Sequence, residues 1–329
     1  MTDALWYVAP GVTEVRATAL APLEPGWVEV ETEASLLSRG TERLIASGRV
    51  PQSEHARMRA PLQEGDFPFP VKYGYAAAGR VSAGPASLLG RQVFTLAPHQ
   101  RRLRVPEAMA LPLPEGMSPA RAVFAANVET AINALWDAES APGLPPGTRV
   151  LVIGLGLVGL LMVKVLGTRS GLTIGAVDVI PQRRTRAEHF SGTFYSPSEL
   201  TAENAGTWDV VFHTSANPAG LETALNALRF EGTVIEMSWY GDKPVPVPLG
   251  GAFHARRLTI KSSQVGHIAP SRRSVTTHRD RLAAALALCD DPRLETLVTE
   301  EIALEDVPAA THRLFAPDAD GIATRIVYR

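Results

Sequence analysis

Arg149-Val150-Leu151-Val152-Ile153-Gly154-Leu155-Gly156-Leu157-Val158-Gly159 is the stretch that decides the fold of this 329-residue chain. The apolar, β-branched run before the first glycine predicts a buried strand. The glycines then follow the pattern Gly-x-Gly-x-x-Gly, and an apolar helix-like segment comes next. The first glycine permits a tight turn, the second lets a pyrophosphate approach the backbone, and the third lets helix and strand pack closely. The helix N-terminus adds unpaired N–H groups for the phosphates. The sequence therefore predicts a dinucleotide site with contacts from Gly154, Gly156, Leu157, Val158 and Gly159.

An acidic residue follows at the distance that such a site requires. Asp178 ends the predicted strand 173–178, 24 residues after Gly154. A carboxylate there accepts hydrogen bonds from the adenosine ribose and repels a 2′-phosphate, which favours NAD(H) over NADP(H). Arg183 and Arg184 come soon after and could hold a 2′-phosphate instead, so NADP remains the less favoured cofactor. The alternative for Asp178 is a helix-capping acid.

Strands and helices alternate on either side of this motif. The predicted strands are 149–153, 173–178, 208–214, 233–237 and 258–262, and the predicted helices are 157–166, 182–189 and 220–228. Strands separated by helices of about ten residues indicate βαβ units and a parallel sheet. We therefore predict an α/β chain whose residues 121–265 form a doubly wound Rossmann domain.

The remaining parts of the chain read differently. Residues 27–34 alternate between apolar and polar side chains, as a half-buried strand does, and 79–82 and 92–96 predict further short strands. The region 1–120 is therefore expected to be rich in β-structure. A helix at 278–288 and a strand at 323–328 are predicted in the tail. Ser118 can cap a further helix that has Pro119 at its first position and continues through the largely apolar run 121–136.

Composition excludes several classes of protein. A formal net charge of −2 argues against a generic nucleic-acid binder, which carries a basic surplus. The single cysteine excludes an intramolecular disulfide and a four-cysteine zinc lobe. The longest apolar run, 150–163, is shorter than the roughly 18–20 residues of a membrane-spanning helix, and the first ten residues lack a signal-peptide pattern. We expect a cytoplasmic protein that acts on a small molecule, without nucleic-acid or membrane partners.

With its β-rich first part, central nucleotide motif and returning tail, the chain resembles the medium-chain dehydrogenase/reductase superfamily. Gly79-Arg80-Val81, the prolines of 105–114 and Gly232-Thr233-Val234-Ile235 also carry the resemblance. It implies that 1–120 and 266–329 form a GroES-like catalytic domain into which the Rossmann domain is inserted. It further implies a substrate cleft between the two domains and a homodimer formed through the sheet edge near 258–261.

The positions of the family's catalytic zinc ligands are altered in this chain. Arg39 stands where zinc alcohol dehydrogenases carry cysteine, and Tyr75 and Ala76 replace the histidine and glutamate of a Gly-His-Glu motif. Ala125-Ala126-Asn127, near the third ligand position, offers neither thiolate nor carboxylate. Because a catalytic zinc needs about three N, S or O ligands, the resemblance implies a member without zinc.

The motifs are most similar to those of bacteriochlorophyllide-type dehydrogenases. These carry Ser-x-Gly-Thr-Glu, as this chain does at 38–42, and Gly-Tyr-Glu where it has Gly74-Tyr75-Ala76. The resemblance implies hydride exchange with a secondary alcohol or ketone, and it does not extend to the pigment substrate.

Without a metal, a hydrogen-bond donor must manage the charge on the substrate oxygen. Thr41 occupies the position whose hydroxyl relays the proton in the zinc enzymes, and Tyr75 could donate to a carbonyl from the vacated ligand position. The alternatives are a turn hydroxyl and a packed aromatic ring. Arg39 and Glu42 are candidate substrate contacts or an ion pair that braces the site. His99 is a candidate substrate contact or a surface-loop histidine.

Polar residues end several predicted strands of the nucleotide domain. Ligands bind beyond the carboxyl ends of parallel strands, so these residues are cofactor or substrate candidates. They are Thr214, Ser215, Ser238 and Ser263 for the cofactor, with Arg183 from the loop after Asp178, and Trp239 for the substrate.

The sequence thus favours a zinc-independent oxidoreductase that transfers a hydride between NAD(H) and a secondary alcohol or ketone. An NADPH-dependent quinone or enone reductase of the same superfamily is the first alternative. A nucleotide-binding protein without catalytic activity is the second.

Overall fold

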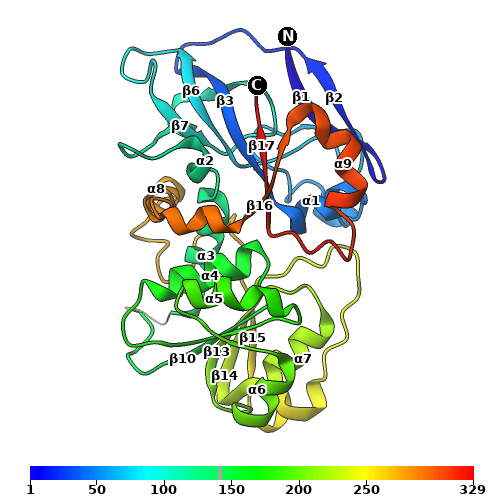
Figure 1. The fold of residues 1–329 in the computed structure, drawn as a ribbon, viewed down its shortest axis with the longest axis vertical. Coiled ribbons are helices and arrows are strands. Elements are labelled where there is room, and N and C mark those ends of the chain that lie inside the picture. Colours follow the sequence, from blue (N-terminus) through cyan, green and yellow to red (C-terminus); the bar gives the residue numbers. More distant parts are fainter. Residues whose placement is uncertain (140–142) are drawn as a thin grey trace. The chain divides into compact units, whose positions relative to one another are not determined.

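A computed structural model describes residues 1–139 and 143–329, with no side-chain description at 201–203. The chain forms two compact units, Met1–Ala126 with Leu286–Arg329, and Asn127–Ala285 (Figure 1). The boundaries expected from the sequence lay at 120/121 and 265/266. The second boundary falls later because α8 (His278–Leu288) is bonded to α3 (Ala125–Ala138), Arg281 Nε lying 3.0 Å from Glu129 Oε1.

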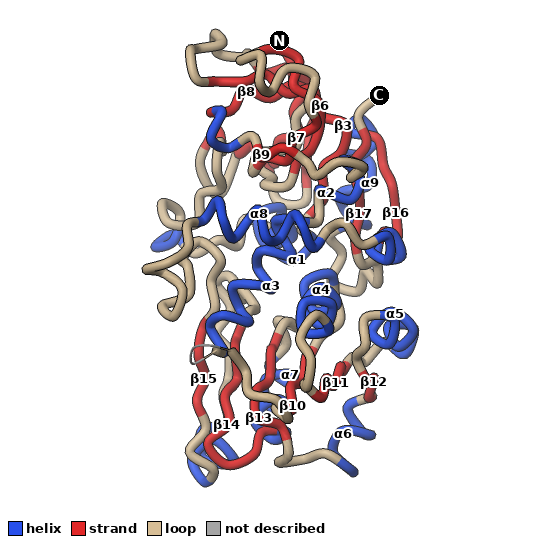
Figure 2. Tube along the Cα trace, turned by 90° about the vertical axis from the view of Figure 1, so that its left-hand side faces the viewer, coloured by secondary structure: helices blue, strands red, loops and turns tan. Residues whose placement is uncertain are grey.

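The second unit contains a six-stranded parallel sheet. Figure 2 shows the strands edge to edge, in the order β12 (Thr193–Tyr195), β11 (Thr173–Val177), β10 (Arg149–Ile153), β13 (Trp208–His213), β14 (Leu228–Glu236) and β15 (Thr259–Ser262). Its helices include α4 (Leu157–Gly167), α5 (Arg184–His189), α6 (Pro197–Glu203) and α7 (Pro218–Ala227). The predicted α/β fold class and parallel sheet are confirmed.

Packing within this sheet explains why a glycine, Gly175, stands in the middle of strand β11. Trp208 is fully buried at the start of β13, and its ring lies against β11. A β-carbon at Gly175, in the middle of β11, would come within 2.5 Å of that ring and 2.7 Å of Leu151. The glycine therefore makes room for the tryptophan that fills the core.

Strand β15 is the last strand of this sheet and has a neighbour on one side only. Such an edge exposes backbone donors and acceptors to a partner strand. The homodimer expected at residues 258–261 would use this edge, and it stays a prediction.

The first unit is built from two sheets. A seven-stranded sheet contains β16 (Val298–Ala303), β17 (Ala323–Val327), β3 (Trp27–Leu37), β6 (Ala77–Ala83), β7 (Gln92–Thr95) and β9 (Leu111–Pro112), with β8 (Arg102–Pro106) paired to β3. A four-stranded sheet has the order β2 (Val12–Thr18), β1 (Thr2–Ala9), β5 (Val71–Lys72), β4 (Glu64–Gly65). Helices α1 (Arg39–Ala46), α2 (Pro119–Ala122) and α9 (Val307–Leu314) belong to the same unit. The β-rich character expected for this region is confirmed.

The helix predicted from Pro119 through 136 begins there, with Ser118 as the N-cap, but is two helices instead of one. Helix α2 ends at Ala122 and α3 begins at Ala125, with the fully buried Val123 and Phe124 between them. The N–H of Phe124 bonds to the carbonyl of Arg121, three residues back. This tighter 3₁₀-type turn ends α2, so the apolar run does not continue as one helix.

Among the described residues, no helix combines the length and the apolar character that a bilayer crossing requires.

Candidate functional site

The glycine-rich turn joins β10 to α4 in the second unit. Gly154 has φ +92°, and a β-carbon there would lie 2.7 Å from the backbone nitrogen of Ser215. A β-carbon at Gly159 would overlap the carbonyl oxygen of Gly154 and lie 2.8 Å from Thr214 Oγ1. Gly156 caps α4 and has nothing within 4 Å of its β-position. The outer glycines thus permit close packing, while the middle one leaves the space that a pyrophosphate would need.

Asp178 holds this turn from the end of β11. Its Oδ2 accepts the N–H of Leu155 at 2.6 Å, and its Oδ1 accepts the N–H of Ile180 at 2.8 Å. Each carboxylate oxygen can accept a further bond, so the two backbone contacts leave capacity for ribose hydroxyls. The carboxylate therefore orients the turn and remains chemically able to take a ribose.

The two arginines after Asp178 are engaged within the protein. Arg183 is 4% exposed, and its Nη1 donates to the carbonyl of Leu155 at 2.9 Å. Arg184 lies over the ring of Phe194 at 4.5 Å and within 3.8 Å of Glu199. Arg183 thus stabilises the glycine-rich turn through its bond to Leu155, and its guanidinium is not exposed as a phosphate-binding cation.

The strand-end residues predicted as cofactor contacts gather at the carboxyl ends of β13 and β14. Thr214 Oγ1 donates to the carbonyl of Gly154 at 2.6 Å, and Ser238 Oγ accepts the N–H of Ala216 at 3.0 Å. The N–H of Ser263, after β15, bonds to the carbonyl of Glu236. Trp239 is half-buried in the loop after β14. The structure brings Thr214, Ser215 and Ser238 together at one edge of the sheet.

Two titratable residues at this edge were missed by the sequence reasoning. His213 ends β13 and Glu236 ends β14, and the strand register sets them opposite each other. His213 Nδ1 lies 2.7 Å from Glu236 Oε2, and His213 Nε2 lies 2.6 Å from Ser215 Oγ. The signal was present in the sequence, because two neighbouring apolar strands each finish on a titratable side chain.

Tyr240 completes this group. Its hydroxyl donates to Glu236 Oε2 at 3.3 Å. Burial first, and the charge of Glu236 second, raise the pKa of Tyr240 above its usual value, so the phenol remains protonated and a donor.

A cluster of three hydroxyls lies in the first unit, where α1 begins. Tyr75 donates to Ser38 Oγ, and its hydroxyl lies 3.5 Å from Thr41 Oγ1. Tyr75 and Thr41 are half-buried, and the ring of Tyr73 supports Tyr75 edge-on at 6.1 Å. The structure thus brings together the two predicted catalytic residues and adds Ser38, for which the sequence predicted no role.

Arg39 and Glu42 do not form the ion pair considered from the sequence. Arg39 Nη1 donates to the carbonyl of Gly321 at 2.5 Å, and Nη2 donates to that of Ala319. These carbonyls belong to the segment before β17, so the guanidinium ties α1 to the tail of the chain. The ion-pair interpretation is wrong because the carboxylate lies on the buried side of α1.

Glu42 is fully buried and accepts three hydrogen bonds. Oε1 accepts the N–H of Ser38 at 2.6 Å, and Oε2 accepts the hydroxyl of Tyr7 at 2.6 Å and lies 3.0 Å from His99 Nε2. His99 is also fully buried, so the surface-loop alternative for it is wrong. A direct contact of Glu42 or His99 with substrate is not supported, since neither is exposed.

The hydrogen bonds of His99 continue across the unit. Its Nδ1 lies 2.7 Å from Ser35 Oγ on β3, which in turn lies 2.7 Å from the hydroxyl of Tyr328. Burial, followed by the charge of Glu42, raises the pKa of Tyr7 well above its usual value, and burial also raises that of Tyr328. Both phenols therefore remain donors, and the network joins the two sheets around one buried carboxylate.

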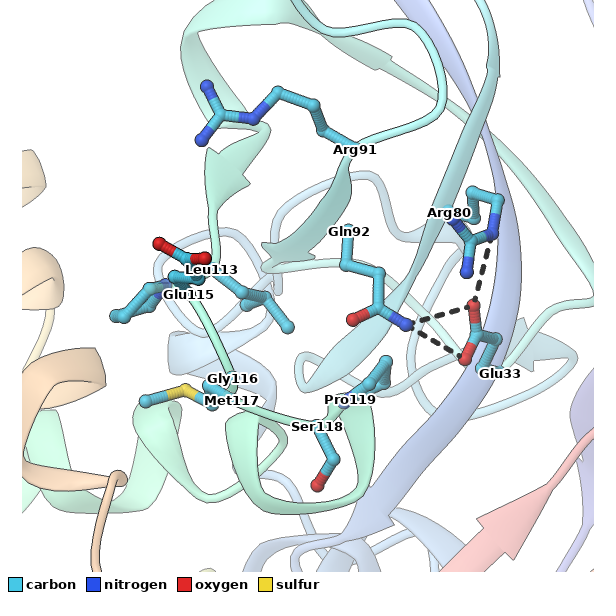
Figure 3. A pocket seen from close by; sticks show the side chains of 11 residues that line it. Glu33, Arg80, Arg91, Gln92, Leu113, Glu115, Gly116, Met117, Ser118 and Pro119 are labelled. Atoms are coloured by element: carbon cyan, nitrogen blue, oxygen red, sulfur yellow. Dashed lines mark hydrogen bonds and ion pairs between the residues drawn. The ribbon is translucent and has the colours of Figure 1, made fainter.

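A surface hollow of about 790 Å³ lies elsewhere in the first unit, near β6, β7 and α2 (Figure 3). Gln92 reaches Glu33 at 3.4 Å, and Arg80 Nε lies 3.9 Å from the same carboxylate. Figure 3 shows Arg91 pointing away from this group. None of the predicted site residues lines the hollow.

The described residues contain no group of three or more His, Cys, Asp or Glu side chains that could hold a metal ion. At the ligand positions named from the sequence, Arg39 bonds to carbonyls, Tyr75 bonds to hydroxyls, and Ala76 is buried.

Comparison with known proteins gives relatives in sequence and in fold. No protein-family model matches the chain. The chain is 27% identical over 213 residues to (R,R)-butanediol dehydrogenase of Bacillus subtilis, covering 62% of this chain and 56% of that protein. It is 33% identical over 153 residues to a protein of Mycobacterium tuberculosis named as a probable zinc-binding alcohol dehydrogenase, covering 44% and 39%. These matches span about half or less of the curated relatives.

The likeness in structure extends over the whole chain. Alcohol dehydrogenase TADH from Thermus sp. ATN1 superposes with a TM-score of 0.73 at 22% sequence identity, covering 99% of this chain and 100% of that one. This likeness shows that the chain has the fold of that alcohol dehydrogenase.

Proposed function

We propose that the protein is an NAD(H)-dependent oxidoreductase that interconverts a secondary alcohol and a ketone without a catalytic zinc. The observation that carries the proposal is the glycine-rich turn held by Asp178, with an open β-position at Gly156. These residues fit a dinucleotide, because a pyrophosphate needs close backbone approach and α4 presents its N-terminus there.

The preference for NAD(H) rests on charge at the end of β11. Asp178 would accept the adenosine ribose hydroxyls, and its charge would repel a 2′-phosphate. Arg183 is nearly buried and bonded to Leu155, which leaves it poorly placed to offset that repulsion.

Hydroxyl groups of the first unit would manage the substrate oxygen. Bound nicotinamide supplies the hydride acceptor or donor. Tyr75 has a single phenolic proton, which it gives to Ser38 Oγ when no ligand is bound. With a ketone bound, this proton would turn to the substrate oxygen, and the Ser38 hydroxyl would donate to the phenol oxygen instead. The phenol would then stabilise the charge that develops on the substrate oxygen, and solvent would supply or take up the substrate's proton. Thr41 lies within reach of the same phenol and can orient it.

The residues at the family's metal positions do not fit a catalytic zinc. A zinc site needs about three N, S or O ligands. Arg39 cannot serve as a ligand while its guanidinium holds two carbonyls, and Ala76 has no donor atom.

Titration of the protein with NADH and NADPH, followed by a turnover screen over secondary alcohols, ketones, quinones and enones, tests the proposal. NADH binding with alcohol or ketone turnover is expected. Tight NADPH binding without NADH binding, together with enone or quinone turnover, would replace it with the reductase alternative. Binding without turnover on any substrate would favour a non-catalytic nucleotide-binding protein.

Asp178→Asn should change the cofactor preference. Asparagine keeps an oxygen for the N–H of Leu155, gives up the bond from the N–H of Ile180, and removes the charge that repels a 2′-phosphate. We expect the ratio of NADPH to NADH affinity to rise by about tenfold, a change of about 1.4 kcal/mol. Fluorescence titration with both cofactors measures it, and an unchanged ratio would show that another group sets the preference.

Tyr75→Phe and Thr41→Val should each lower kcat by about tenfold or more, with a smaller effect on KM. The expected loss is that of a hydrogen bond made to charge that develops in the transition state. Tyr73→Phe is the matched control, because Tyr73 is a buried neighbour outside the hydroxyl cluster. A kcat within twofold of the parent value would make Tyr75 a packing residue.

A further inference from the structure

The proposed function leaves one hydrogen-bonded group of the second unit unused, formed by Glu236, His213 and Ser215. It lies at the carboxyl ends of the neighbouring strands β13 and β14, the edge at which open α/β sheets bind ligands. His213 is fully buried, whereas Ser215 is half-buried. The group therefore runs from the interior to a partly exposed hydroxyl.

With His213 as the neutral imidazole, the chemistry of the partners fixes the direction of each hydrogen bond. The carboxylate of Glu236 can only accept, so His213 carries its proton on Nδ1, at 2.7 Å. His213 Nε2 is then an acceptor, and Ser215 donates its hydroxyl proton to it at 2.6 Å. The N–H of Asn217 donates to Ser215 Oγ at 3.3 Å. Ser215 thus has one remaining lone pair, and toward a ligand it acts as an acceptor.

A serine, a histidine and an acid in this order also occur in nucleophilic catalysis, where an oxyanion must be stabilised by backbone donors. The N–H groups of three residues next to Ser215 are already used. That of Thr214 bonds to the carbonyl of Ile153, that of Ala216 to Ser238 Oγ, and that of Asn217 to Ser215 itself. This arrangement favours ligand binding over acyl transfer.

The protein contains a closed version of the same arrangement. In the first unit, Glu42 faces His99, which faces Ser35, but all three residues are fully buried. Tyr328 lies 2.7 Å from Ser35 Oγ and fills the position that a ligand would take. The group of Ser35 is therefore structural. The group of Ser215 differs from it, because Ser215 keeps a lone pair that can accept a hydrogen bond and is partly exposed.

The position of Ser215 indicates which part of a dinucleotide it would meet. Ser215 lies against the glycine-rich turn, since a β-carbon at Gly154 would come within 2.7 Å of its backbone nitrogen. Strand β11, with Asp178 at its end, lies on one side of β10, and β13 lies on the other. If the adenosine ribose bonds to Asp178, the sugar on the β13 side is the nicotinamide ribose. A phosphate cannot donate to Ser215, whereas a ribose hydroxyl can.

We propose that Glu236 and His213 are positioning residues that orient the Ser215 hydroxyl as a hydrogen-bond acceptor for the nicotinamide-side ribose of the bound dinucleotide. The proposal rests on the proposed function only for the presence of a dinucleotide. Gly220 of α7 is part of the arrangement, because a β-carbon there would overlap Ser215 Oγ and lie 2.8 Å from His213 Nε2.

The test is calorimetric titration of the full chain with AMP, ADP-ribose and NADH. Ser215→Ala should lower the affinity for ADP-ribose and for NADH by about three- to tenfold, the range for one lost hydrogen bond. The affinity for AMP should stay unchanged. Thr223→Ala is the matched control, because the hydroxyl of Thr223 bonds only to the carbonyl of Ala219 in its own helix. Equal ADP-ribose binding by the Ser215 variant and the parent would overturn the proposal.

Two further variants separate positioning from a structural role. His213→Ala should reproduce the loss of ADP-ribose affinity, and His213→Gln should restore most of it, since the amide oxygen can accept the Ser215 proton. In a Ser215→Ala background, neither change at 213 should weaken ADP-ribose further. Additive losses, or a glutamine variant as weak as the alanine variant, would overturn the assignment, and the His213→Gln result decides it if His213→Ala does not fold.

The same titrations distinguish a failure of the positioning role from a failure of the proposed dehydrogenase reaction. Binding of NADH and ADP-ribose without turnover would overturn the dehydrogenase proposal and leave the positioning role measurable. A parent protein that binds none of the three ligands would overturn the dinucleotide site and this role together.

Discussion

Gly159→Ala is expected to abolish measurable NADH binding and to lower the melting temperature of the protein. A β-carbon at this position would overlap the carbonyl oxygen of Gly154 and stand 2.9 Å from its carbonyl carbon and 2.8 Å from Thr214 Oγ1. The two Gly154 atoms are backbone atoms of the turn and cannot rotate away as a side chain could. Helix α4 must then move off β10, which carries the donors for the phosphates away from their position.

Substitutions at two other glycines serve as controls that separate cofactor binding from stability. Gly156→Ala should leave the melting temperature unchanged, because its φ of −68° is ordinary and nothing lies within 4 Å of its β-position. It should still lower the affinity for NADH by tenfold or more if a pyrophosphate approaches there. Gly250→Ala, also with nothing within 4 Å, should change neither property. Full NADH affinity in the Gly156 and Gly159 variants together would show that the turn holds no dinucleotide.

The second unit was largely predictable because each of its signals is local. The run 149–153 and the three glycines predicted a strand, a turn and a helix, and the structure has β10 at Arg149–Ile153 and α4 from Leu157. The helix 278–288 was also predicted with the bounds that α8 has. In such segments the hydrophobic period and the turn chemistry agree, so little depends on distant contacts.

The first unit was less predictable because its site depends on pairings between distant residues. Glu42 meets Tyr7 across 35 positions and His99 across 57, and no local pattern reports either pairing. Proximity in sequence suggested instead that Glu42 pairs with Arg39. Residues three apart on a helix are neighbours, so the pairing was a reasonable expectation. Distant partners decide otherwise, because the guanidinium bonds to the segment before β17 while the carboxylate bonds to Tyr7 and His99 in the core.

The site in the second unit lies between these cases. Ser215 and Thr214 were named because polar residues after a buried strand are a local signal. The partnership of His213 with Glu236 required knowledge that β13 and β14 are adjacent and in register. Once the parallel order of strands is known, that pairing follows from the sequence, since both residues end their strands.

Glu42→Ala should be the most destabilising single change among the residues of the first unit's site. It removes the acceptor for the Tyr7 hydroxyl, His99 Nε2–H and the N–H of Ser38, all of which are buried. Buried donors left without partners cost about 1–3 kcal/mol each, and a broken buried charged network costs about 3–5 kcal/mol. A fall of about 10 °C in the melting temperature is expected by calorimetry, since 1 kcal/mol shifts a unit of this size by about 2–4 °C.

Two control variants test whether the loss of this hydrogen-bond network causes the expected fall in melting temperature. Glu14→Ala, which removes an exposed pair with Arg16, should change the melting temperature by less than about 2 °C. Tyr7→Phe alone should destabilise, but in the Glu42→Ala background it should cost less or even stabilise, because the phenol no longer has an acceptor. Equal effects of Tyr7→Phe in both backgrounds would mean that the carboxylate and the phenol do not depend on each other. The buried carboxylate would then stabilise the unit through the N–H of Ser38 and His99 alone, and the expected loss for Glu42→Ala would shrink accordingly.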